Sequence, residues 1–170
     1  KKMTDFRQAH PTGVIFAMDQ IRAYLQASLK RVWYPIGQTR MMRVSPQRDS
    51  VAFYGGLDVI SGQEVALSLP KMTAINTRHF LQHVIVCFPG RHILILWDRA
   101  SWHKSVARQF VADHPLLDMI YFPTACPHLN AQEHVWKLVR EAVGHLRDYR
   151  YIDDLRKAFQ AHLDRVLFNI

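Results

Sequence analysis

Three acidic residues stand where the sequence pattern suggests metal chemistry. The apolar run "GVIFAMD", residues 13 to 19, ends on Asp19, and "HILILWD", residues 92 to 98, ends in the same way on Asp98. A third acid, Glu133, lies in "AQEHVWKLVREAVGHL". Carboxylates held close together repel one another, so a cluster of them calls for a cation. Because the ligands would all be oxygens, Mg²⁺ or Mn²⁺ is the expected ion.

The two aspartates depend on two strands to bring them together. Both apolar runs are typical of short buried strands. If these strands are parallel neighbours, Asp19 and Asp98 meet at one edge of the sheet, where open α/β sheets bind ligands. An ordinary alternative stays open for each acid. A strand-end Asp is often a turn or cap residue, and Glu133 also fits a solvated helix face, paired with Lys137 four residues on.

The rest of the chain alternates between strand and helix patterns. Residues 50 to 70 predict a hairpin turning at "SGQ", in which Gly55-Gly56 indicates a bulge or a close backbone approach. Helical spacing begins at Asn76, interpreted as an N-cap, and stops at Pro89-Gly90. The remaining predicted elements are a helix at 103–114, a strand at 117–122, and helices at 131–146 and about 152–167. This order predicts an α/β fold with a mixed sheet flanked by helices.

Composition bounds the class of protein. The chain has 170 residues, 49% hydrophobic and 21% charged, which predicts one soluble globular domain with a substantial core. It has two cysteines outside any Cys-x-x-Cys pair, which favours reduced thiols over a zinc site. No apolar run approaches the roughly 18 residues that span a bilayer, and no secretion signal is visible. We therefore expect no membrane partner and a cytoplasmic location, in a bacterial cytosol or nucleoid.

The charge balance indicates a polyanionic partner. The net charge is +8 and the pI is about 9.8. Nucleic acid is the commonest partner of so basic a protein, although a merely basic protein stays possible on charge alone. The basic residues are dispersed over several segments, which favours a basic face over a basic tail.

The second half of the chain resembles the catalytic core of the mariner-like insertion-sequence transposases, a branch of the DDE transposase/integrase superfamily. The resemblance rests on "ILILWDRASWHKS" and "IYFPTACPHLNAQEHVWKLVR". Between Asp98 and Glu133 lie 34 residues, the separation characteristic of this branch. In the first half, Asp19 and the later segment "VWYPIGQTR" are similar to the family pattern. The family's proline-bearing loop and helix motif matches at Pro123, Pro127, Leu129, Asn130, Glu133 and Trp136.

The resemblance implies a fold and an activity. The fold would be ribonuclease H-like, with a mixed five-stranded sheet, formed by residues 1 to 170 as a single catalytic domain. Asp19, Asp98 and Glu133 would hold two divalent ions, Mg²⁺ or Mn²⁺, for displacement at phosphorus by water or a DNA 3′-hydroxyl. The implied partners are DNA, as transposon ends and target, and a second copy in a homodimer. The helix-turn-helix region usual before this core is expected to be absent.

Several further residues are expected to support this site. His103 holds the family's His position and would orient a carboxylate or contact DNA, unless it only opens a helix. Asn130 is expected to cap the helix that carries Glu133. Phosphate contacts of basic side chains carry affinity without sequence choice. The candidates for such contacts are Arg99, Lys104, Lys137 and Arg140.

Three positions depart from the family pattern. Gln20 stands where an acid usually follows the first Asp, Arg99 where Asn follows the second, and Ala131 where proline follows Leu-Asn. None removes a metal ligand, but the Arg99 cation would compete with a metal or contact a phosphate. Two alternatives therefore stay open. One is a decayed or truncated module that binds DNA or dimerises without catalysis. The other is a ribonuclease H or junction resolvase on the same fold.

Overall fold

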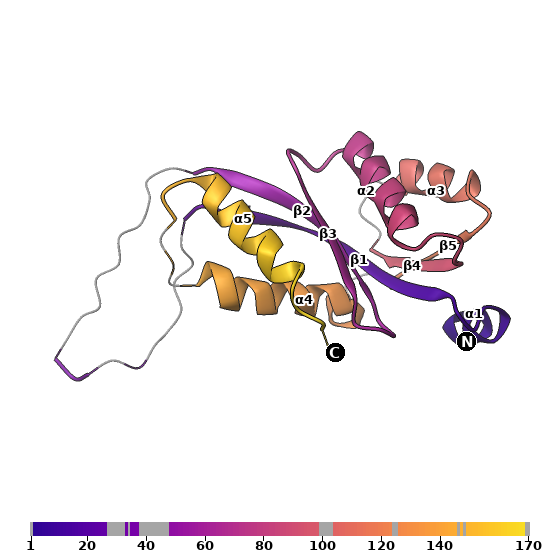
Figure 1. The fold of residues 1–170 in the computed structure, drawn as a ribbon, viewed down its shortest axis with the longest axis horizontal. Coiled ribbons are helices and arrows are strands. Elements are labelled where there is room, and N and C mark those ends of the chain that lie inside the picture. The colour runs from indigo at the N-terminus through magenta and orange to yellow at the C-terminus, as the bar shows by residue number, and fades with distance from the viewer. Residues whose placement is uncertain are drawn as a thin grey trace.

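A five-stranded mixed sheet organises the molecule (Figure 1). The computed structural model describes residues 2–26, 33, 35–37, 48–98, 104–123, 126–145, 147 and 149–168. The strands lie in the order β3-β2-β1-β4-β5, with β1 antiparallel to β2 and parallel to β4. Their bounds are β1 Val14–Tyr24, β2 Ser50–Asp58, β3 Glu64–Leu69, β4 Ile93–Trp97 and β5 Leu117–Tyr121. The predicted mixed sheet and the predicted parallel neighbours are therefore confirmed.

β1 is longer than the sequence pattern predicts. It pairs with β4 only from Val14 to Ala17, but its ladder with β2 continues to Tyr24. The prediction that this strand ends at Asp19 is therefore wrong, because β2 still supplies a hydrogen-bonding neighbour beyond that point. Within the described residues, the β4-side edge of β1 has no strand beside it after Ala17. Asp19 lies at this step in the sheet, and Asp98 directly follows the end of β4.

Helices cover both faces of the sheet (Figure 1). α2 and α3 pack on one face around Phe16 and Phe80, and α4 and α5 pack on the other around Phe53 and Phe159. Side chains alternate along β1, so Asp19 shares the α4 side with Ile21. The helices are α1 Lys2–Ala9, α2 Ala74–Cys87, α3 Lys104–Ala112, α4 Ala131–Val139 and α5 Ile152–Leu163.

Helix ends and irregular turns differ from the sequence-based boundaries. α2 begins two residues before Asn76, because the hydroxyl of Thr73 accepts from the Asn76 N–H at 3.3 Å and caps the helix. A short 3₁₀ turn, Pro127–Leu129, precedes α4, and a π-helical turn, Arg140–Gly144, follows it. α5 ends at Leu163 rather than near residue 167. These shifts reflect local hydrogen bonds, which apolar periodicity does not report.

α1 has no counterpart among the predicted elements. Its Phe6 packs with Ile15 of β1 and Leu94 of β4 in a small third cluster. A single apolar anchor gives a short helix little periodic signal, which is why the pattern missed it. Among all the helices described, none is both long and apolar enough to traverse a bilayer.

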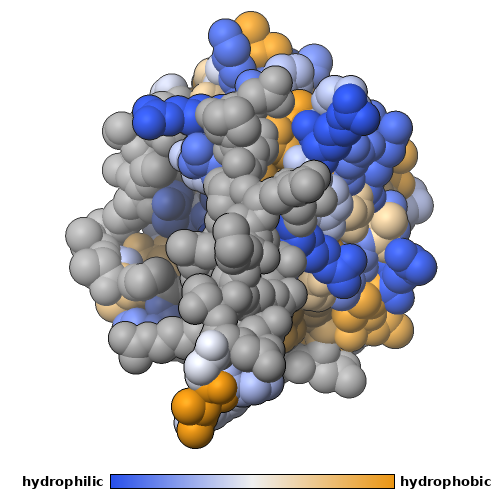
Figure 2. Space-filling view, turned by 90° about the vertical axis from the view of Figure 1, so that its left-hand side faces the viewer, coloured by the Kyte–Doolittle hydropathy of each residue, from blue (hydrophilic) through white to orange (hydrophobic). Residues whose placement is uncertain are grey.

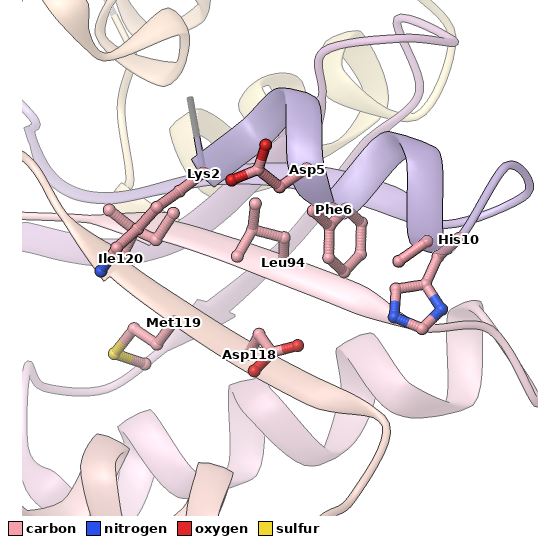
Figure 3. A pocket seen from close by; sticks show the side chains of 9 residues that line it. Lys2, Asp5, Phe6, His10, Leu94, Asp118, Met119 and Ile120 are labelled. Atoms are coloured by element: carbon pink, nitrogen blue, oxygen red, sulfur yellow. The ribbon is translucent and has the colours of Figure 1, made fainter.

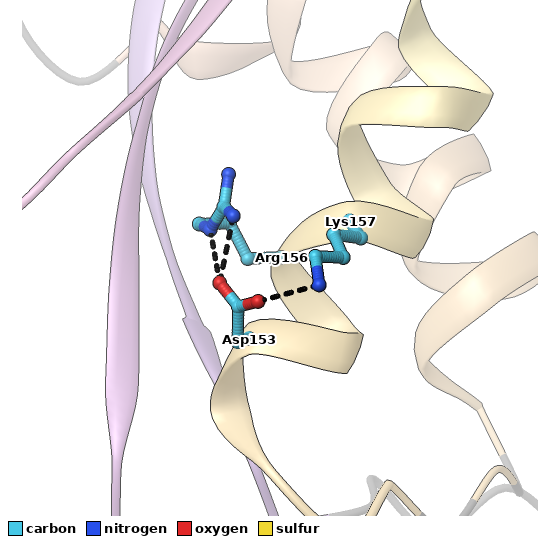
Figure 4. A network of polar contacts seen from close by, with 3 residues as sticks. All are labelled: Asp153, Arg156 and Lys157. Atoms are coloured by element: carbon cyan, nitrogen blue, oxygen red, sulfur yellow. Dashed lines mark hydrogen bonds and ion pairs between the residues drawn. The ribbon is translucent and has the colours of Figure 1, made fainter.

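The outer face of α5 carries an ion-pair network (Figure 4). The Asp153 carboxylate lies 2.7 Å from an Arg156 nitrogen and 2.9 Å from Lys157 Nζ. These two side chains lower the pKa of Asp153 through hydrogen bonds. Exposed pairs of this kind contribute little to stability. The network does show that Arg156 and Lys157 share one acidic neighbour.

Candidate functional site

Asp19 is the electrostatic centre of the candidate site. It is partly buried on β1, opposite Gly55 of β2. Burial is the largest cause that raises the pKa of its carboxyl, and a hydrogen bond from the Gln20 backbone opposes it. The negative charges of Glu133 and Asp98 raise the pKa further, and the net value is about 7. The fold thus brings both Glu133 and Asp98 within electrostatic range of Asp19.

The Trp136 side chain lies beside Asp19. It is fully buried, so it serves as a packing residue of this face. The indole lowers the pKa of Asp19, yet its buried Nε1 has no acceptor in hydrogen-bonding geometry among the described residues. We therefore interpret the indole N–H as an oriented dipole near the carboxylate, because the geometry falls short of a formed hydrogen bond.

Glu133 and Asp98 lie near enough to Asp19 to affect its pKa, but the carboxylates do not form a closed metal-binding site. In the part of the chain that the structure describes, no three His, Cys, Asp or Glu side chains converge closely enough to hold a metal ion. Burial is the main cause of the raised pKa of Asp19, and the negative charges of Glu133 and Asp98 add to it. An all-carboxylate donor set fits Mg²⁺ or Mn²⁺, whose charge would offset both effects.

Asn130 fixes the start of the helix that carries Glu133. Its side-chain oxygen accepts from the Gln132 N–H at 3.1 Å, and its Nδ2 donates to the Met18 carbonyl at 3.0 Å. The first bond confirms the predicted cap of α4. The second bond joins α4 to β1 at the residue directly before Asp19. The buried Asn130 side chain thereby fixes the position of the first turn of α4, which carries Glu133, relative to the segment of β1 that carries Asp19.

A second contact of the same helix turn involves a residue that sequence reasoning missed. Gln132 Nε2 donates to Glu64 Oε1 on β3 at 2.7 Å. Burial raises the pKa of Glu64 to about 8, partly offset by Gln132 and by the Gly56 backbone. In the sequence, Glu64 merely opens a strand after a turn, so it resembles an ordinary solvated acid. The partner that buries it lies 68 positions away, which no local pattern reveals.

Gly55 allows α4 to approach the sheet at this point. A Cβ built on Gly55 would meet the Trp136 ring and would lie 2.7 Å from Gln132 Nε2. The strand ladder runs regularly through Gly55, opposite Asp19 on one side and Ala66 on the other. Of the two predictions for this glycine, the close approach is therefore confirmed.

One hollow lies beside Glu133 on α4, and a second lies by the turn that follows this helix. Glu133 is exposed in a hollow of about 570 Å³ lined also by Lys137, His128 and His134. Arg140 instead lines a second hollow, of about 280 Å³, together with Arg22 of β1. Of the predicted DNA contacts, Lys137 lies on the same helix as Glu133, and Arg140 begins the π-helical turn directly after it.

The second hollow has basic and apolar walls. Its lining also includes Tyr24 and the buried residues Leu155 and Phe159. It lies toward the end of the molecule where β1, α4 and α5 come together in Figure 1. Figure 2 looks onto this end, where hydrophilic side chains gather beside smaller apolar areas.

A third hollow, of about 340 Å³, lies between α1 and the β4–β5 edge of the sheet. Figure 3 shows Phe6 and Leu94 on its apolar side, with Lys2, Asp5 and Asp118 around it. It contains none of the residues predicted to be functional.

Some predicted residues cannot be placed relative to this site. Arg99 and His103 lie outside the described residues, and so does most of "VWYPIGQTR". Lys104 is the first residue of α3, and only its backbone is described. Their expected roles stay predictions. Gln20, which departs from the family pattern, lies in β1, and its buried Nε2 has no partner among the described residues.

Comparison with known families and structures gives consistent results. The model of the DDE superfamily endonuclease family matches residues 14–156. The Mos1 transposase paired-end complex with left transposon end is similar, with a TM-score of 0.71 and 12% identity, over 97% of this chain and 52% of that chain. The Mos1 mariner paired end complex with Mn has a TM-score of 0.67 and 12% identity, over 89% and 48% of the two chains.

A more distant likeness extends to a viral assembly. A chain of the simian T-cell lymphotropic virus intasome in complex with PP2A regulatory subunit B56 gamma has a TM-score of 0.54 and 11% identity, over 89% of this chain and 47% of that chain. No curated protein matches this sequence significantly. At such low identities the structural likeness establishes the ribonuclease H-like fold, which confirms the predicted fold class. The chain spans about half the length of the matched transposase chains.

Proposed function

Because the chain belongs to the DDE superfamily endonuclease family, we propose that it is the catalytic domain of a transposase that cleaves DNA and transfers strands at transposon ends. The observation that carries the proposal is the electrostatic coupling of Asp19 to Glu133 and Asp98 at the step in the sheet. A structural cap or turn acid needs no neighbouring carboxylates of this kind. The likeness to Mos1 complexes that contain transposon ends supports the same reading.

Asp19, Asp98 and Glu133 would hold two divalent ions, Mg²⁺ or Mn²⁺. The occurrence of Mos1 complexes with Mn and with Mg supports this assignment. When bound, such ions supply an activated water or DNA 3′-hydroxyl and stabilise the leaving oxygen. The chain itself must present ionised carboxylates, so the Asp19 proton has to be released to solvent before the site can be loaded.

Basic side chains beside the acids would hold the DNA. Lys137 lies one helical turn from Glu133 on the same face, and Arg140 lies nearly one turn further. Their positions suit contacts to phosphates on either side of the scissile bond, which position a strand without reading its sequence. We include Arg99, His103 and Lys104 in this surface as predictions. A homodimer, and action in the cytosol or nucleoid, belong to the same proposal.

The decisive experiment is Mn²⁺-dependent nicking of duplex DNA that carries insertion-sequence ends. We expect Asp19→Asn, Asp98→Asn and Glu133→Gln each to abolish cleavage while circular dichroism and thermal unfolding stay those of a folded protein. Asp118→Asn makes the same chemical change at an exposed strand acid outside the site and should cut normally. If any of the three site variants cuts like the parent, the three-acid site is wrong.

Two further comparisons test the alternative functions. Preferential cleavage of an RNA–DNA hybrid would favour a ribonuclease H, and preference for a four-way junction would favour a resolvase. DNA binding that weakens with salt, with no heat of Mn²⁺ binding in calorimetry, would favour a module that has lost catalysis.

A further inference from the structure

Glu64 is a buried acid for which the proposed reaction has no role. Its Oε2 is buried and makes no hydrogen bond of acceptable geometry among the described residues, although its Oε1 accepts from Gln132 and the nearby Gly56 backbone lowers the pKa of the carboxyl. Gln132 mirrors this condition, since its Oε1 is also buried without a partner while its Nε2 donates. Both orphaned atoms are acceptors when Glu64 is ionised, and orphaned buried acceptors are costly.

Protonation of Glu64 would give a hydrogen-bond partner both to Glu64 Oε2 and to Gln132 Oε1. A neutral acid can donate from Oε2 to the Gln132 oxygen while its Oε1 still accepts from the Gln132 nitrogen. The two side chains would then share two hydrogen bonds instead of one. The burial that raises the pKa of Glu64 to about 8 favours this neutral form near neutral pH.

The pair spans the strand that faces Asp19. Gln132 extends from α4 across Gly55 of β2, where a Cβ would lie 2.7 Å from its Nε2, to reach Glu64 on β3. Asn130 joins the same helix turn to β1 on the other side of β2. The first turn of α4 is therefore held at two points, and Glu133 lies in that turn.

We propose that Glu64 is a positioning residue, which as a neutral acid paired with Gln132 holds the first turn of α4 on the sheet and so sets Glu133 relative to Asp19. This inference rests on the proposed three-acid metal site. Glu64 contacts neither the metal nor the DNA in this role. Loss of the pair would lower metal affinity by leaving Glu133 free to move away from Asp19.

The test measures Mn²⁺ affinity of the full chain by titration calorimetry, together with metal-dependent nicking. We expect Glu64→Leu to weaken Mn²⁺ binding by about tenfold or more, the usual effect of losing a residue that supports a ligand. Glu64→Gln should bind like wild type, because a glutamine pair keeps both hydrogen bonds. Gln132→Leu should match Glu64→Leu, and the double variant should be no worse than either single one.

A matched control separates positioning from lost stability. Val84→Ala removes buried volume from the cluster on the opposite face of the sheet and should leave Mn²⁺ affinity unchanged. Wild-type affinity in Glu64→Leu would overturn the inference. So would an affinity in Glu64→Gln as poor as in Glu64→Leu, because a required charge would then explain the residue. Absence of Mn²⁺ binding by the wild-type protein would instead overturn the proposed function itself.

Discussion

At the scale of single residues, Asp19 combines the metal-binding role that we propose for it with a cost in folding stability. In the folded protein the pKa of its carboxyl is about 7, against an ordinary value of 3.8. Between these two values the unfolded chain is ionised while the folded site keeps its proton. Without a divalent ion, Asp19 therefore lowers the free energy of unfolding progressively as the pH rises from about 4 to 7. A strongly shifted pKa that lowers the stability of the fold is typical of titratable side chains in functional sites.

The pH dependence of stability tests this reading. In EDTA, we expect Asp19→Asn to be more stable than wild type at pH 8 by up to a few kcal/mol, since each pH unit of displaced ionisation is worth about 1.4 kcal/mol. At pH 4 the two proteins should differ much less. Urea unfolding at pH 4, 6 and 8 measures both differences. A constant difference across this range would show that Asp19 ionises normally.

Metal binding should show the opposite pH dependence. Because a cation binds only the ionised Asp19, the apparent Mn²⁺ affinity of wild type should rise as the pH increases and level off above about 7. Calorimetry at pH 5.5, 6.5 and 7.5 measures this change. An affinity independent of pH would mean that Asp19 is not among the ligands.

At the scale of elements, the site depends on how closely α4 approaches β2. Trp136 and Gln132 pack directly over Gly55, which lies opposite Asp19 in the ladder. Asn130 adds the contact to β1. These interactions come from one helix turn, so the same packing that builds the core on this face also sets the distance between the acids.

Gly55→Ala should damage both stability and the site. Its Cβ would overlap the Trp136 ring, and overpacking of this kind costs about 1–3 kcal/mol. We expect the displaced helix to bind Mn²⁺ more weakly as well. Gly144→Ala is the control, because its Cβ meets nothing nearer than Phe159 Cε2 at 3.9 Å. Equal unfolding free energies and equal Mn²⁺ affinities for Gly55→Ala and wild type would refute the close approach.

At the scale of the whole molecule, the basic residues behind the net charge of +8 have different surroundings. Arg22 and Arg140 line one hollow, Arg22 from the strand that carries Asp19 and Arg140 from the turn directly after the helix that carries Glu133. Arg156 and Lys157, by contrast, are engaged by Asp153 on α5. Arg22 and Arg140 thus differ from Arg156 and Lys157 in their surroundings, a hollow in one case and an acidic partner in the other, although all four contribute equally to the net charge.

This difference predicts a salt dependence of DNA binding. We expect the double variant Arg22→Ala, Arg140→Ala to reduce the slope of log K against log salt by about two, because each lost phosphate contact removes roughly 0.9. Arg156→Ala, Lys157→Ala removes the same charge and should change the slope far less. Fluorescence anisotropy between 50 and 200 mM salt measures both, and equal slopes for the two double variants would place the DNA elsewhere.

Apart from α1 and the irregular turns, the order of helices and strands and the Asn130 cap could be predicted from the sequence, which also singled out the three acids as candidates. These features are encoded locally, in apolar periodicity, in cap residues and in the 34-residue spacing from Asp98 to Glu133. The family resemblance rested on the same local motifs.

The surroundings of the acids, in contrast, depend on contacts between segments that are distant in the sequence. The continuation of β1 past Asp19 depends on β2 as a neighbour, and the bond from Asn130 to Met18 joins residues 112 positions apart. The pairing of Glu64 with Gln132 likewise depends on β3 lying beside β2 under α4. Burial and cross-strand contact arise when distant segments pack together, so the raised pKa of Asp19 and the role of Glu64 have no signature in any short stretch of the chain.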